Sequence, residues 1–131
     1  MHYLVATDSV HTTAAACDYL DGRLDGPNTD TVTVITVTGG DDRDAGDAAN
    51  VARARLAGRA TVETLAREGD PGEAIIDAVV EVDADVLVLG PRSGAPGAQP
   101  ELGSTARSVL ARSPVPAVVV PLEQLDPAGV E

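Results

Sequence analysis

The chain has 131 residues, which suits one domain with its own core, and no apolar run reaches the roughly eighteen residues of a membrane-spanning helix. Its 21 acidic and 9 basic residues give a formal net charge of −12, which disfavours nucleic acids and anionic membranes as partners. All nine basic residues are arginines, so phosphate-binding loops that require lysine and Schiff-base chemistry are excluded. There are two histidines and one cysteine, which excludes metal sites built from three histidines or four cysteines.

The first half of the chain predicts strands that alternate with helices. The apolar run at 2–7 predicts a buried strand, and apolar residues then recur at helical spacing over 10–24. A β-branched run at 30–38, with glycines before and after it, predicts the second strand. Small and apolar residues on one face predict a second helix over 44–58.

The segment 60–67 is short and has β-branched residues near its start, so we favour a strand, although its pattern also fits a helix. The helix predicted over 70–84 has clear start signals. Asp70 suits the N-cap, Pro71 suits the first helical position, and Glu73 stands three residues after the cap.

The last third predicts a strand over 85–90, a helix over 103–113 and a strand framed by prolines over 116–121. We expect a single domain over 1–121 and a loose tail over 122–131. The strands are too continuously apolar for a half-exposed antiparallel sheet. The expected fold is therefore α/β, a doubly wound five-stranded parallel sheet with four helices on its two faces.

Asp8 follows the first predicted strand directly. Ligands of open α/β sheets bind at the carboxyl ends of strands, where a carboxylate can accept a hydrogen bond from a ribose hydroxyl or reach a metal carried by phosphates. Asp8 serves equally well as the N-cap of the next helix, so both interpretations stay open at this point.

The start of the last predicted helix suits an anion. Gly103 allows close approach to the backbone, Ser104 and Thr105 supply hydroxyls, and helix N–H groups point outward there. Arg92 and Arg107 could add charge-assisted contacts. The alternative is that Ser104 only caps the helix and the neighbouring glycines only permit turns.

Four stretches, "YLVATD", "EGDPGEAI", "ADVLVLGPRSG" and "LGSTARSVLARSPVPAVVVP", resemble the universal stress protein family, and the resemblance covers residues 2–121. It implies an adenine-nucleotide alpha-hydrolase-like sheet with strand order 3-2-1-4-5. That order places the ends of the first and fourth strands side by side, so Asp8 and the fourth loop are expected to line one crevice.

The nucleotide-binding branch of that family has the pattern Gly, two residues, Gly, nine residues, Gly, then Ser or Thr. Gly90, Gly103 and Ser104 match its ends, whereas Ser93 stands at the middle position with Gly94 one residue later.

A second departure follows the first strand, where the family commonly reads Asp-Gly-Ser and this chain reads Asp8-Ser9-Val10. If glycine is needed there for positive φ, Ser9 is expected to cost on the order of 1 kcal/mol.

The resemblance implies a binding site in which Asp8 lies near the adenosine and the backbone of Val37 lies beside the adenine. It also implies that Gly90, Arg92 and Gly94 line the loop, and that Gly103, Ser104 and Thr105 hold phosphates.

The resemblance implies that the ligand is ATP or a related adenine nucleotide, with or without Mg²⁺. The nucleotide is expected to regulate the protein in a cytoplasmic stress response. The protein is expected to be a homodimer that pairs through residues 116–121. No side chain is placed as a general base or an activated nucleophile, so we expect at most slow ATP hydrolysis. A nucleotide-free, dimeric interaction module is the alternative. An adenylyl-transferring enzyme is disfavoured because no glycine follows the first strand. The acidic, lysine-free composition further resembles cytoplasmic proteins of halophiles.

Overall fold

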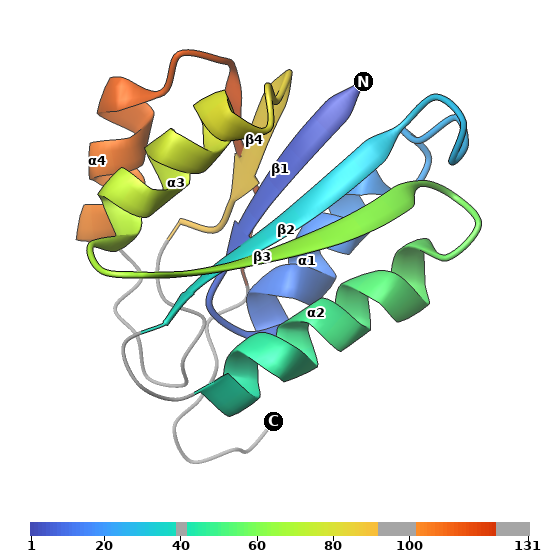
Figure 1. Ribbon diagram of the computed structural model, residues 1–131, viewed down its shortest axis with the longest axis horizontal. Coiled ribbons are helices and arrows are strands. Elements are labelled where there is room, and N and C mark those ends of the chain that lie inside the picture. Colours follow the sequence, from blue (N-terminus) through green and yellow to red (C-terminus); the bar gives the residue numbers. More distant parts are fainter. Residues whose placement is uncertain (39–41, 92–101, 123–131) are drawn as a thin grey trace.

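The computed structural model describes residues 1–38, 42–91 and 102–122 (Figure 1). Its five strands form one parallel sheet in the order β3-β2-β1-β4-β5. They are β1 (His2–Thr7), β2 (Thr31–Thr38), β3 (Thr61–Glu68), β4 (Val86–Leu89) and β5 (Ala117–Val119). The expected α/β fold and strand order are confirmed.

Four helices in the described part of the chain cover the sheet, with α1 and α2 on one face and α3 and α4 on the other (Figure 1). They are α1 (Val10–Leu20), α2 (Asp42–Leu56), α3 (Pro71–Glu81) and α4 (Ser104–Arg112). None of the helices in these described ranges is long and apolar enough to cross a membrane.

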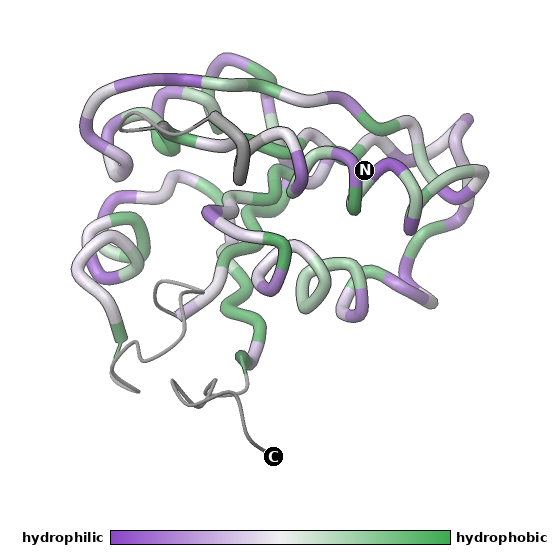
Figure 2. Tube along the Cα trace, turned by 90° about the horizontal axis from the view of Figure 1, so that it is seen from below, coloured by the Kyte–Doolittle hydropathy of each residue, from purple (hydrophilic) through white to green (hydrophobic). Residues whose placement is uncertain are grey.

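The sheet separates two hydrophobic clusters because successive side chains of a strand point to opposite faces. On β1, Tyr3 and Val5 pack with α1 and α2, whereas Leu4 and Ala6 pack with α3 and α4. Figure 2 shows the hydrophobic colour concentrated in the strands through the middle of the molecule and hydrophilic residues toward the outer turns. The continuous apolar runs of the sequence therefore reflect burial on both faces.

The ambiguous segment at 60–67 is a strand, and the start of the following helix is as predicted. The Asp70 carboxylate accepts a hydrogen bond from the Glu73 N–H at 2.9 Å, and Pro71 opens α3. The helix predicted over 10–24 is too long, because the chain turns at Gly22 with a φ of 86° and α1 ends at Leu20.

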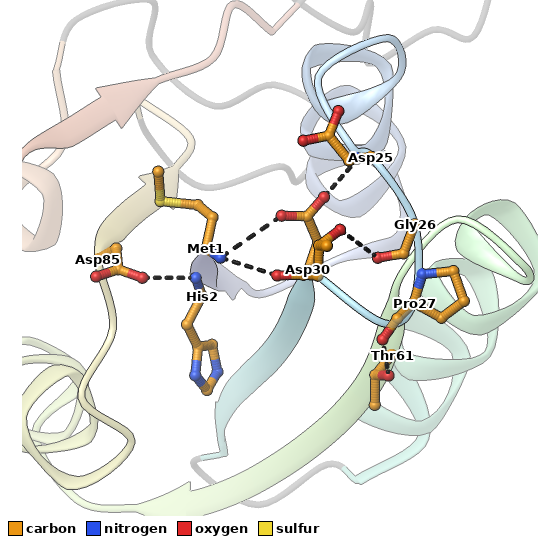
Figure 3. A network of polar contacts seen from close by, with 9 residues as sticks. Met1, His2, Asp25, Gly26, Pro27, Asp30, Thr61 and Asp85 are labelled. Carbon is orange, nitrogen blue, oxygen red and sulfur yellow. Dashed lines mark hydrogen bonds and ion pairs between the residues drawn. The ribbon is translucent and has the colours of Figure 1, made fainter.

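At the amino ends of the strands, Asp30 joins several of them (Figure 3). Its side chain is buried and lies 3.7 Å from the ammonium group of Met1, and its carbonyl accepts a hydrogen bond from the Thr61 N–H at 2.9 Å. The His2 N–H donates to the Asp85 carboxylate at 2.7 Å, which connects β1 to the residue before β4. This network, the amino-end network, holds the starts of four strands in register.

Arg55 of α2 forms an ion pair with Asp18 of α1 at the surface, and Arg59 pairs with Asp21 just beyond the carboxyl ends of these two helices. All four side chains remain partly exposed. Cys17 lies buried beneath them, and burial raises the pKa of its thiol to about 11.

The aromatic residues of the chain are Tyr3 and Tyr19, and both belong to the α1 and α2 side of the sheet. The Arg23 guanidinium lies 4.1 Å from the centroid of the Tyr19 ring. Burial raises the pKa of Tyr3.

Candidate functional site

A cleft of about 340 Å³ opens at the carboxyl ends of β1, β2 and β4 and at the start of α4. Six of the residues predicted for nucleotide binding line it: Asp8, Val37, Gly90, Gly103, Ser104 and Thr105. The other two, Arg92 and Gly94, lie outside the described residues, as does Ser93 at the middle of the glycine pattern. The topology thus brings together residues that are up to 97 positions apart in the sequence, from Asp8 to Thr105.

The N-cap of α1 is not Asp8, the residue that the sequence offered for this position. Ser9, not Asp8, is the N-cap, and its hydroxyl oxygen accepts the Thr12 N–H at 3.1 Å. Ser9 has a φ of −161°, which is extended backbone that any residue adopts, so the strain expected from a serine at this position is absent. The interpretation of Asp8 as a mere helix cap is therefore wrong, and its carboxylate lies in the lining of the cleft.

Thr12 also lines the cleft and was not predicted. It is buried, and its hydroxyl donates a hydrogen bond to Oδ1 of Asp8 at 3.2 Å. The signal in the sequence is the spacing of four residues, which places a residue of the first helical turn beside the end of the preceding strand.

The start of α4 has no side-chain cap. Gly103 is the N-cap and Ser104 is the first helical residue, so the interpretation of Ser104 as a cap is wrong. The first N–H groups of a helix have no acceptor within the helix, and the helix dipole places partial positive charge there. No acidic residue stands in this first turn. Of the described residues that line the cleft, this turn is the part best suited to an anion.

The lining of the cleft therefore has chemically different parts. Asp8 is a hydrogen-bond acceptor with negative charge, whereas the first turn of α4 presents N–H donors, together with the Ser104 and Thr105 hydroxyls. Ile35, Val37 and Leu89 contribute an apolar wall to the same lining. An apolar body with a hydroxyl on one side and an anionic group on the other would match this arrangement.

No group of three His, Cys, Asp or Glu side chains within the described ranges is close enough to share a metal ion. The stretch 41–47 contains four aspartates, of which Asp41 lies outside the described residues and Asp47 is exposed on α2.

The profile of the family described as Universal stress protein family matches residues 29–121. No curated protein matches the chain.

Among solved structures, hypothetical protein MJ0577 is similar at 18% identity and a TM-score of 0.76, over 93% of this chain and 96% of that one. A universal stress protein in complex with cAMP is similar at 24% identity and a TM-score of 0.70, over 94% and 98%. The universal stress protein of Archaeoglobus fulgidus in complex with dAMP is similar at 22% identity and a TM-score of 0.64, over 92% and 97%. The fold is shared with these proteins, and the profile covers well over half of the sequence. The chain belongs to the universal stress protein family.

Proposed function

We propose that this protein binds ATP or a related adenine nucleotide in the cleft, as a regulatory ligand in a cytoplasmic stress response. The observation that carries the proposal is that one cleft combines an uncapped helix start, the Asp8 carboxylate and an apolar wall. The similar structures in complex with cAMP and with dAMP support an adenine mononucleotide unit as the part that is recognised.

In this proposal the apolar wall at Val37 receives the adenine, and Asp8 receives the ribose. The phosphates meet the first turn of α4 at Gly103, Ser104 and Thr105. Gly90 also lines the cleft, and Arg92 and Gly94 follow it in the sequence. The proposed ligand includes ATP with or without a Mg²⁺ ion on its phosphates.

The test is the adenine-nucleotide content of the purified protein, followed by calorimetric titration with ATP, AMP and cAMP in buffer with molar KCl. We expect either one co-purified adenine nucleotide per chain or saturable binding of at least one of the three. Absence of both would favour the alternative, a nucleotide-free interaction module.

We also propose that two copies pair through residues 116–121. This segment contains β5, an edge strand of the sheet, and the side chain of Val119 is 37% exposed there. An apolar edge strand without a partner favours aggregation, so pairing with a second copy would protect it.

The net charge of −12 predicts that salt stabilises the fold, in keeping with a halophile-type protein. The Debye length falls from about 10 Å at 0.1 M salt to about 3 Å at 1 M, which screens repulsion among the acidic side chains. Salt also weakens the exposed pairs of α1 and α2, but such pairs contribute only about 0–1 kcal/mol each. We expect the melting temperature, measured by circular dichroism, to rise by about 5 °C or more between 0.1 M and 2 M KCl. An unchanged melting temperature would contradict this prediction.

A further inference from the structure

We infer that Thr12 is a positioning residue that orients the Asp8 carboxylate toward the hydroxyl groups of the ligand's sugar. The site would then select ribonucleotides over nucleotides that lack those hydroxyls. The inference deepens the proposed function and rests on it.

The inference begins with a directed set of hydrogen bonds at the start of α1. The Thr12 N–H donates to the Ser9 hydroxyl oxygen at 3.1 Å, and the Ser9 hydroxyl donates to the Thr12 hydroxyl oxygen at 3.1 Å. The Thr12 hydroxyl then donates to Oδ1 of Asp8 at 3.2 Å. Because each hydroxyl has one proton, the donation from Ser9 leaves the proton of Thr12 for Asp8.

Burial holds the Thr12 side chain in place. Thr12 is 2% exposed and belongs to a helix, where a β-branched side chain has few allowed rotamers. Asp8 directly follows β1 and is exposed, so its carboxylate is accessible from the cleft. The bond from Thr12 therefore limits the orientation of a carboxylate that lines the cleft.

The chemistry of that part of the cleft favours a hydroxyl. An ionised carboxylate only accepts hydrogen bonds and has about four acceptor positions, so it can accept from a ligand while Thr12 occupies one position. Its negative charge repels phosphate, which instead finds the partial positive charge at the start of α4. With its sugar hydroxyls at Asp8 and its phosphate at the start of α4, the ligand binds in a single orientation.

Thr13 provides a matched control on the same helix. It is also fully buried, and its hydroxyl donates to the Ser9 carbonyl at 2.8 Å and pairs with the Thr7 hydroxyl at 2.9 Å. These contacts join the start of α1 to the last residue of β1, they do not involve Asp8, and Thr13 does not line the cleft. Thr12→Val and Thr13→Val each exchange a buried hydroxyl for a methyl group of similar size.

The experiment measures the Kd values of ATP and of 2′,3′-dideoxy-ATP by calorimetry in molar KCl. For the wild type we expect a preference for ATP of about tenfold, since a hydrogen bond to a charged group is lost with the dideoxy ligand. Thr12→Val should reduce the preference to about threefold or less, mainly through weaker binding of ATP. Thr13→Val should keep the wild-type preference, and Thr12→Ser, which retains a hydroxyl, should restore it.

A double-mutant cycle separates positioning from a general loss of stability. Asp8→Ala should abolish the preference, and adding Thr12→Val to Asp8→Ala should change the ATP Kd no further. The inference is overturned if Thr12→Val keeps the full preference for ATP over the dideoxy form. It is also overturned if Thr12→Val weakens ATP binding equally in the wild type and in Asp8→Ala. If wild-type protein binds ATP without preferring it over the dideoxy form, only this inference fails. If wild-type protein binds no adenine nucleotide, the proposed function fails and the inference fails with it.

Discussion

Replacing Gly103 by valine should weaken adenine-nucleotide binding by about ten- to one-hundredfold while the protein remains folded. Gly103 is the N-cap of α4 and has a φ of −72° and a ψ of 164°, a conformation that valine adopts readily. The substitution therefore adds no backbone strain. It places a branched side chain in the lining of the cleft, beside the N–H groups proposed to hold the phosphates. The measurement is the Kd of ATP by calorimetry, with the melting temperature recorded for each variant.

Gly46→Val is a suitable control for this substitution. Gly46 lies on α2 outside the lining of the cleft, and a Cβ added there meets no atom within 4 Å. We expect this variant to bind like the wild type. An unchanged Kd in Gly103→Val would contradict the placement of phosphate at the start of α4.

Replacing Asp30 by alanine should lower the free energy of unfolding by about 2–3 kcal/mol. The Asp30 side chain is 5% exposed, accepts a hydrogen bond from the Asp25 N–H, and lies 3.7 Å from the Met1 ammonium group. Removal of the carboxylate leaves the partly buried Asp25 N–H without its acceptor. It also removes the negative charge near the Met1 ammonium group, which still donates to the Thr29 carbonyl at 2.9 Å. We expect the ion pair to contribute less than the hydrogen bond, because Met1 lies at the surface, with its side chain 49% exposed, and solvent screens the charge there.

The sign of this effect distinguishes Asp30 from the other acidic residues. In a chain of net charge −12, removing an exposed carboxylate should be neutral or slightly stabilising, because repulsion decreases. Asp25→Ala is the matched control, since the Asp25 side chain is exposed and only its backbone N–H enters the contact with Asp30. Urea unfolding at neutral pH measures both variants. Equal stabilities would show that the amino-end network contributes nothing measurable.

Hydrophobic periodicity predicted the elements of this fold well because it follows which side chains are buried. The alternation of Tyr3 and Val5 with Leu4 and Ala6 places β1 between two helical layers. Asp70 and Pro71 were sufficient to locate the start of α3. The strand order came from the family resemblance, since local patterns do not specify which parallel strands are neighbours.

The details of the site were harder to predict because they depend on shifts of one residue. Asp8 and Ser9 are both good N-caps, and only the backbone shows that Ser9 takes this position. At α4 the cap is Gly103 and Ser104 already belongs to the helix. The contact of Thr12 with Asp8 depends on these positions, and its sequence signal, the spacing of four residues, is informative only once the start of α1 is known.

Asp30 illustrates a different difficulty. In the sequence it is the first residue of a predicted strand and resembles the many acidic residues that face solvent. It is buried because several parallel strands begin at the same end of the sheet and surround it (Figure 3). Such burial depends on tertiary structure and leaves no periodic signal in the chain.

The position of the two tyrosines determines what ultraviolet spectroscopy can report about this protein. The chain has no tryptophan or phenylalanine, and Tyr3 and Tyr19 both lie on the side of α1 and α2 and outside the lining of the cleft. Tyrosine emission should therefore follow unfolding of that layer, including the stacking of Arg23 on Tyr19, and respond little to a ligand. Adenine absorbs strongly where such a protein absorbs weakly, so an absorption spectrum of the purified protein would reveal a retained nucleotide directly.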